Sequence, residues 1–158
     1  MDIAGKPDIK HDLFTFPWPL KDECATEVYC SHFFEHIPGM IRGQWMDELY
    51  RVMQFDAKAT IICPYGQSNR AVQDFTHRWP PVMPESFLYF NAEWRRANLL
   101  THGSYDLKCD FDFTYGYSVT PQVASRNEEY KVFALTHYIN AASDIQVTLI
   151  KTRRNEAS

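Results

Sequence analysis

Two apolar, strand-like segments on either side of an amphipathic helix constrain the fold more than any other feature of the sequence. The strand-like segments are residues 27–31 (EVYCS) and residues 59–65 (ATIICPY), and a proline stops the second. Between them, residues 40–53 (MIRGQWMDELYRVM) carry apolar side chains at the spacing of one helical face: Ile41, Trp45, Leu49 and Val52. Strand, helix and strand with short connections predict a right-handed βαβ unit with parallel strands. The apolar content of residues 27–31 predicts a strand buried on both faces.

The rest of the chain predicts further elements around this unit. We expect a strand over 8–13, a long loop with one short helix over 66–86, a helix over 84–100, a half-exposed strand over 107–113, a helix over 127–140 and a closing strand over 144–152. Parallel core strands followed by alternating, antiparallel C-terminal strands make an α/β domain with a mixed sheet. Because no repeat, low-complexity tract or linker divides residues 1–158, we expect a single domain.

Composition narrows the classes of partner and location. A net charge of −4 gives the chain no basic face, which disfavours nucleic acid as a partner. The first residues form no apolar signal segment and no apolar run is long enough to span a bilayer, so we expect no membrane partner. The four cysteines lack a C-x-x-C pair, as free thiols in a reducing compartment do: Cys24, Cys30, Cys63 and Cys109. We therefore expect a cytoplasmic protein.

Residues 32–36 (HFFEH) spell H-x-x-E-H and admit three interpretations. In zinc hydrolases this spelling puts two histidines on one helical face, here His32 and His36, with Glu35 as general base. Strand-like residues before this segment and Pro38 shortly after it leave room for little more than one helical turn, which disfavours zinc. The histidines could instead be hydrogen-bonded structural residues at a strand end. The third interpretation places them over a ligand pocket.

The location of these residues favours the pocket. In an open α/β sheet, ligands bind at the carboxyl ends of the parallel strands. The residues at three consecutive predicted strand ends are Asp12 with Leu13, His32 with Glu35 and His36, and Tyr65. The sequence therefore predicts a crevice of the cofactor-binding type at this edge of the sheet.

Short motifs follow one another in a fixed order along residues 2–90. The residues that carry them are Asp2, Asp12-Leu13, Pro17-Trp18-Pro19, Asp22, His32-Glu35-His36, Glu48, Arg51-Val52, Pro64-Tyr65 and Asp74-Phe75-Thr76-His77. This ordered series resembles class I S-adenosylmethionine-dependent methyltransferases of the small type-11-like branch. That branch has an acidic residue at the end of its second strand, then D-L, P-W-P-x-x-D-x-S, H-x-x-E-H, E-x-x-R-V-L-K-P-G-G, V-P and D-P-T-H. The resemblance implies a Rossmann-like fold and an H-x-x-E-H segment that binds no metal.

The resemblance also implies a cofactor and a site. The cofactor would be S-adenosylmethionine, and its methyl group would pass to a small-molecule or sugar acceptor. By resemblance, Asp2 would bind the ribose hydroxyls, Asp12 would lie near the adenine amino group with Leu13 packed on the ring, and His32 would border the sulfonium. The acceptor would be bordered by Glu35, Tyr65 and Asp74 and by the catalytic candidates His36 and His77. A histidine serves as general base when the acceptor is a hydroxyl, because imidazole titrates near neutral pH.

The sequence departs from the family pattern at two places. The Gly-rich loop after the first strand, roughly L-N-L-G-C-G, has no counterpart, and the chain begins where the second strand should be ending. Phe55-Asp56-Ala57 replaces the P-G-G turn, which suggests a relaxed constraint or a different loop there. We therefore expect a truncated, N-terminally incomplete domain over residues 1–158. Its exposed edge strand should pair with a neighbour, which predicts a homo-oligomer such as a dimer.

Three origins of such a chain stay open. It could be the C-terminal part of a longer methyltransferase, which we favour for its ancestry, or a shortened protein that lost catalysis, or a chain whose missing strands come from a partner. The function expected from the resemblance is methyl transfer. This expectation includes the case in which the truncated chain is inactive. The alternative is a non-catalytic, methyltransferase-derived domain for protein interaction or oligomerisation.

Overall fold

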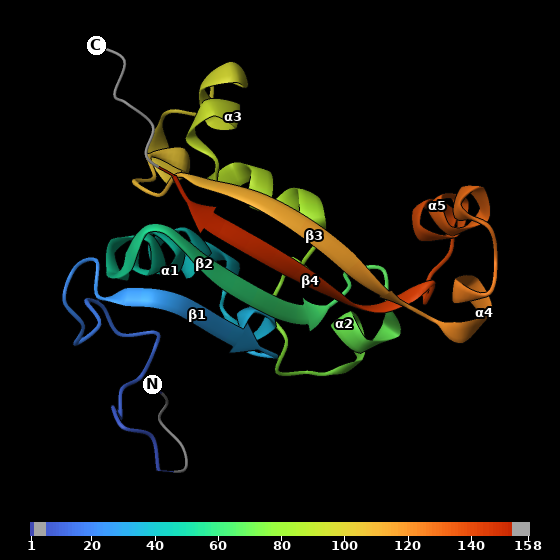
Figure 1. Cartoon of the computed structure of the whole chain (residues 1–158), viewed down its shortest axis with the longest axis horizontal. Coiled ribbons are helices and arrows are strands. Elements are labelled where there is room, and N and C mark those ends of the chain that lie inside the picture. Colours follow the sequence, from blue (N-terminus) through green and yellow to red (C-terminus); the bar gives the residue numbers. More distant parts are fainter. Residues whose placement is uncertain (2–5, 153–158) are drawn as a thin grey trace.

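A four-stranded mixed sheet organises the molecule. The computed structural model describes Met1 and residues 6–152. The strands are β1 (Ala25–Ser31), β2 (Met53–Pro64), β3 (Phe111–Val119) and β4 (Ala142–Lys151). They lie in the order β1-β2-β4-β3 (Figure 1). β1 and β2 are parallel, and β4 runs antiparallel to both β2 and β3. The predicted mixed α/β sheet, with a parallel pair followed by C-terminal antiparallel strands, is confirmed.

Short helices connect these strands. They are η1 (Phe34–His36), α1 (Gly39–Val52), α2 (Asn69–Gln73), η2 (Pro84–Phe90), α3 (Ala92–Ala97), η3 (Gly103–Tyr105), α4 (Pro121–Ala124) and α5 (Glu128–His137), where η marks a 3-10 helix. The predicted amphipathic helix is confirmed as α1, which buries Trp45, Met46, Leu49 and Val52 against the sheet. Among the described residues, every helix is too short or too polar to serve as a membrane span.

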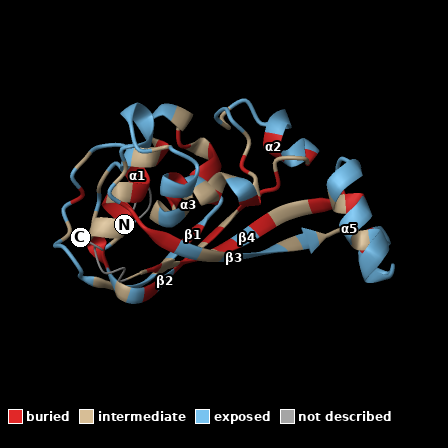
Figure 2. Cartoon of the chain, turned by 90° about the horizontal axis from the view of Figure 1, so that it is seen from above, coloured by how far each residue is buried: buried red, intermediate tan, exposed pale blue. Residues whose placement is uncertain are grey.

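One face of the sheet is covered and the other is open. Figure 2 shows α1, α2 and α3 on the same side of the sheet. Ile61, Val147 and Leu149 face the core and are fully buried. Tyr29, by contrast, is 69% exposed, so the prediction that residues 27–31 are buried on both faces is wrong. The physical reason is that no helix of the described part of the chain covers the second face, and alternate side chains of β1 therefore point to solvent.

The N-terminal segment differs from the prediction. Residues 8–13 form no strand, and only Lys10 has a single bridge partner. The side chain of Asp12 accepts a hydrogen bond from the amide of Phe14 at 2.9 Å, and its carbonyl accepts from the amide of Thr15 at 2.9 Å. This turn, built on an aspartate, replaces the extended conformation that the sequence suggested.

Two further expectations need refinement. The segment Phe55-Asp56-Ala57, which replaces P-G-G, lies inside β2, and Asp56 keeps a left-handed backbone with φ of 64°. Aspartate tolerates this conformation better than most residues, so the special backbone survives without glycine. The helix expected over 84–100 is broken at Asn91, whose side chain accepts from the amide of Trp94 at 2.8 Å and so starts α3 anew.

Candidate functional site

The carboxyl ends of β1 and β2 lie at the same end of the sheet, with α2 beside them (Figure 1). The chain leaves β1 through His32, whose φ is 51° and whose amide still donates to the carbonyl of Ile62 at 2.8 Å. η1 follows, and the buried Phe34 anchors it by stacking on Phe87 at a centroid distance of 5.5 Å. No helix carries His32 and His36 together, which rules out the zinc-protease arrangement of this pair.

A second segment, residues 74–78, packs against η1 although it lies 40 residues further along the chain. The side chain of Asp74 accepts from the amide of Thr76 at 2.9 Å and from its hydroxyl at 2.7 Å. These hydrogen bonds hold the pKa of Asp74 below its usual range. The amide of Arg78 donates to the carbonyl of Glu35 at 2.9 Å, so the turn over residues 74–77 lies directly against η1.

The two segments bring five predicted site residues together. We call His32, Glu35, His36, Asp74 and His77 the His–Glu cluster. Within it, His32 Nδ1 lies 3.3 Å from Glu35 Oε1, and His77 Nε2 lies 3.8 Å from Asp74 Oδ2. The rings of His36 and His77 meet edge to face with centroids 4.9 Å apart. The structure thus places these five of the predicted site residues near one another.

Glu35 is the most unusual member of the His–Glu cluster. Its residue surface is only 5% exposed, and in the described part of the chain its Oε2 is buried without a hydrogen-bond partner. Two thiols lie close enough for its charge to affect their pKa values. Burial raises the pKa of Cys30 to about 12, and the carboxylate of Glu35 adds to that rise. Burial and the same carboxylate also raise the pKa of Cys63, so both thiols stay protonated and unreactive at neutral pH.

Arg42 connects the His–Glu cluster to α1, a role that no pattern in the sequence indicates. Its buried guanidinium donates to the carbonyls of Ile37 at 3.0 Å, Pro80 at 2.6 Å and Arg78 at 3.1 Å. These contacts tie both segments of the cluster to one helix. Burial lowers the pKa of Arg42, and the nearby carboxylate of Glu35 opposes that change.

The other predicted site residues lie elsewhere. Asp2 falls outside the described residues, and Asp12 is exposed in its turn. Tyr65 is 2% exposed, and its hydroxyl donates to the carbonyl of Leu135 at 3.0 Å. Burial raises the pKa of Tyr65. Leu13 lines a cavity of about 430 Å³ between β1, α1 and the N-terminal segment, together with Phe33. That volume is within the range of small-molecule sites.

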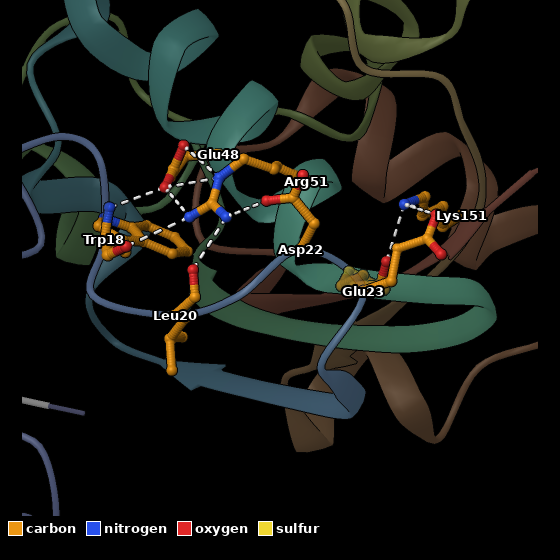
Figure 3. A network of polar contacts seen from close by, with 8 residues as sticks. Trp18, Leu20, Asp22, Glu23, Glu48, Arg51 and Lys151 are labelled. Atoms are coloured by element: carbon orange, nitrogen blue, oxygen red, sulfur yellow. Dashed lines mark hydrogen bonds and ion pairs between the residues drawn. The ribbon is translucent and has the colours of Figure 1, made fainter.

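The remaining motif residues form a separate network, which Figure 3 shows. Glu48 Oε1 accepts from the amide of Trp18 at 2.7 Å, and Arg51 Nε donates to both oxygens of Glu48 at 3.1 Å. Arg51 also donates to the carbonyls of Trp18 at 3.2 Å and Leu20 at 2.9 Å and to Asp22 at 2.5 Å. We call these five residues the loop network. It holds the segment that contains Pro17-Trp18-Pro19 and Asp22 onto α1, so its role is to stabilise the fold.

No protein-family profile and no curated protein sequence matches the chain. A SAM-dependent methyltransferase from Archaeoglobus fulgidus matches with a TM-score of 0.59 and 18% identity, over 90% of this chain and 66% of that one. A proposed sarcosine dimethylglycine methyltransferase from Galdieria sulphuraria matches with a TM-score of 0.54 and 12% identity, over 93% of this chain and 59% of that one. The cyclase SpnF matches with a TM-score of 0.50 and 13% identity, over 92% and 56%.

These likenesses show the fold. The chain has the class I fold of SAM-dependent methyltransferases, as the resemblance in sequence implied. It spans 66% or less of each of these three structures. SpnF is described as a cyclase, so the fold alone does not determine the reaction.

Proposed function

We propose that this chain is a methyltransferase-like protein that binds S-adenosylmethionine and transfers its methyl group to a small-molecule or sugar acceptor. The observation that carries the proposal is the His–Glu cluster. Five polar residues from two distant segments converge at the carboxyl ends of β1 and β2, where ligands bind in open α/β sheets. The fold of the solved methyltransferases described above supports the same reaction class.

The cavity beside β1 is the proposed cofactor site. Leu13 and Phe33 give it an apolar wall that suits an adenine ring, and Phe14 stacks on Phe33 at a centroid distance of 5.6 Å. Asp12 precedes Leu13 in the sequence and His32 directly follows β1, but neither residue lines the cavity. The fit is partial, because the sequence has no G-x-G loop to lie against the methionine part of the cofactor. When bound, S-adenosylmethionine supplies an electrophilic methyl group.

The His–Glu cluster would act on the acceptor. Methyl transfer is a direct displacement, in which the acceptor atom bonds to the methyl carbon as the sulfonium leaves as a thioether, so alignment is the main requirement. Glu35 and Asp74 would orient the acceptor through hydrogen bonds. A hydroxyl acceptor also has to lose its proton, and Nε2 of His36 or His77 is the proposed recipient.

Calorimetric titration with S-adenosylmethionine and S-adenosylhomocysteine tests the cofactor site. We expect saturable binding in the micromolar range, which Leu13→Asp abolishes because it puts a charge against the adenine wall. Leu99→Asp is the matched control, since Leu99 is 79% exposed and does not line the cavity. A folded chain that binds neither compound contradicts the proposal.

A non-catalytic interaction or oligomerisation domain is the second candidate. The observation that favours it is the open edge of β1, which pairs only with β2 among the described strands. An open edge invites strand pairing with a second copy, so we propose a homo-oligomer. Light scattering after size-exclusion chromatography measures this, and a monomer at all concentrations contradicts it. The net charge and the free thiols support the further proposal of a cytoplasmic protein without nucleic-acid or membrane partners.

A further inference from the structure

We propose that Glu35, His36 and His77 form a binding site for a divalent transition-metal ion, with Zn²⁺ as the representative. Each residue offers one ligand atom, and these three atoms lie within 4.8 Å of one another. A tetrahedral zinc ion separates its ligand atoms by about 3.3 Å, so binding would draw the three side chains slightly together. This set differs from the H-x-x-E-H pair, because His77 comes from the 74–77 turn and His32 is not part of it.

The hydrogen bonds of the two histidines place the proton on Nδ1 and leave Nε2 as the nitrogen that could bind an ion. His77 Nδ1 lies 3.2 Å from the carbonyl of Ala71, which can only accept. His36 Nδ1 lies 3.4 Å from the carbonyl of Thr76 and 3.2 Å from its hydroxyl oxygen. That hydroxyl donates its own hydrogen to Asp74 at 2.7 Å, so its oxygen accepts from His36. Both rings therefore carry the proton on Nδ1 when neutral, and the unprotonated nitrogens are the two Nε2 atoms. That of His77 lies 3.8 Å from Asp74 Oδ2, which is too long for a hydrogen bond.

This arrangement is the one that protein metal sites use. A metal-bound histidine almost always donates its other ring N–H to a carbonyl or carboxylate, which fixes the tautomer and the ring orientation. Both histidines here already do so. Arg42 adds rigidity, because it binds the backbone of Arg78, next to one ligand, and of Ile37, next to another.

An independent observation at Glu35 points to the same ligand. Its Oε2 is a buried carboxylate oxygen without a hydrogen-bond partner among the described residues, in a side chain that is 95% buried by its residue surface. Leaving a buried charged oxygen unpaired is costly, and native proteins rarely do so without an ion or another ligand. Two imidazole nitrogens and one carboxylate suit Zn²⁺ and its neighbours in the first transition row. The proposal does not depend on methyl transfer.

The test is titration of the chelator-treated whole chain with metal ions. Calorimetry monitors the titration with Zn²⁺, and visible absorption monitors the titration with Co²⁺. We expect one ion per chain and cobalt bands that report nitrogen and oxygen ligands. Glu35→Gln and His77→Asn should each lower the affinity by at least about 100-fold, since each removes a ligand. His102→Asn is the matched control, because His102 is exposed and lies outside the site.

Folding and cofactor binding are measured on the same samples, so that outcomes can be told apart. Circular dichroism identifies a variant that fails to fold, and Glu35→Gln, which preserves shape, then decides. The proposal is overturned if the wild-type chain binds no stoichiometric Zn²⁺, or if binding survives both ligand substitutions. Because the titration contains no S-adenosylmethionine, its result is independent of the result of the cofactor test.

Discussion

Two buried glutamates differ in how completely their carboxylates are hydrogen-bonded. Glu48 and Glu35 each pair with a basic side chain three residues away, Arg51 and His32 respectively. Both oxygens of Glu48 are hydrogen-bonded, and Oε1 binds the amide of Trp18 as well. Glu35 has one oxygen near His32 and the other without a partner in the described residues.

The difference teaches which motif residues hold the fold and which are available to a ligand. A buried charge that is fully hydrogen-bonded holds its neighbours in place, and removing its partner is strongly destabilising. A buried charge that is left unsatisfied is held there by the surrounding fold and is available to a ligand. Glu48 belongs to the first kind, and Glu35, on the proposals above, belongs to the second.

The largest expected effect is on the side of the loop network. Glu48→Ala leaves the guanidinium of Arg51 and the amide of Trp18 without their carboxylate, so we expect a loss of about 2–4 kcal/mol in the free energy of unfolding. Urea denaturation measures it. Glu129→Ala serves as the control, because Glu129 is exposed in the first turn of α5. A loss below about 1 kcal/mol would remove the distinction between the two glutamates.

The loop network should also make stability depend on acid. Hydrogen bonds from Arg51 lower the pKa of Glu48 in the folded state. A carboxyl whose pKa is lower in the folded than in the unfolded state, where it is about 4.3, stabilises above that pH and stops doing so as the pH falls through the folded value. Glu48→Gln lacks this contribution and should cost about 1–2 kcal/mol at neutral pH. The gap from wild type should narrow between about pH 5 and pH 3, and a constant gap contradicts the assignment.

The same chemical change at Glu35 should have a much smaller effect. Glu35→Gln removes a buried charge whose Oε2 has no partner among the described residues, and its amide can donate to a nearby imidazole lone pair. In chelator-treated protein we expect stability to stay the same or to rise by up to about 1 kcal/mol. Denaturation of the two Glu→Gln variants side by side gives the comparison directly. A loss of about 1–2 kcal/mol, equal to that expected for Glu48→Gln, would make Glu35 a structural residue like Glu48.

Local patterns predicted the elements that are long or strongly periodic. α1, the parallel pair β1 and β2, and the closing strand β4 all follow from apolar periodicity. The prediction of a strand over residues 8–13 was wrong because Asp12 forms a turn with its own neighbours. The prediction of one helix over residues 84–100 was wrong because the side chain of Asn91 caps a new helix there.

The candidate site divides in the same way. Motif order identified the members of the His–Glu cluster, because they sit at strand ends or in a matched motif. It could not show that Glu35 Oε2 lacks a partner in the described part of the chain or that Arg42 binds three carbonyls of the two segments. Those facts depend on contacts between segments that are far apart in the sequence, and no local period encodes them.

The substitution with the smallest expected change in stability distinguishes the loop network from the His–Glu cluster most sharply, because it should change Zn²⁺ affinity alone. Thr76→Val keeps the shape of the side chain but removes the hydroxyl that accepts from His36 Nδ1. Because this turn is partly exposed, stability should change by no more than about 0.5 kcal/mol. Zn²⁺ affinity should nevertheless fall about tenfold, since the acceptor that orients a ligand histidine is lost. Thr136→Val on α5 is the control: it removes a hydroxyl that donates to the carbonyl of Val132 and should change neither quantity. If the affinity of Thr76→Val equals that of wild type, the hydroxyl does not orient His36, and the carbonyl of Thr76 alone fixes the tautomer.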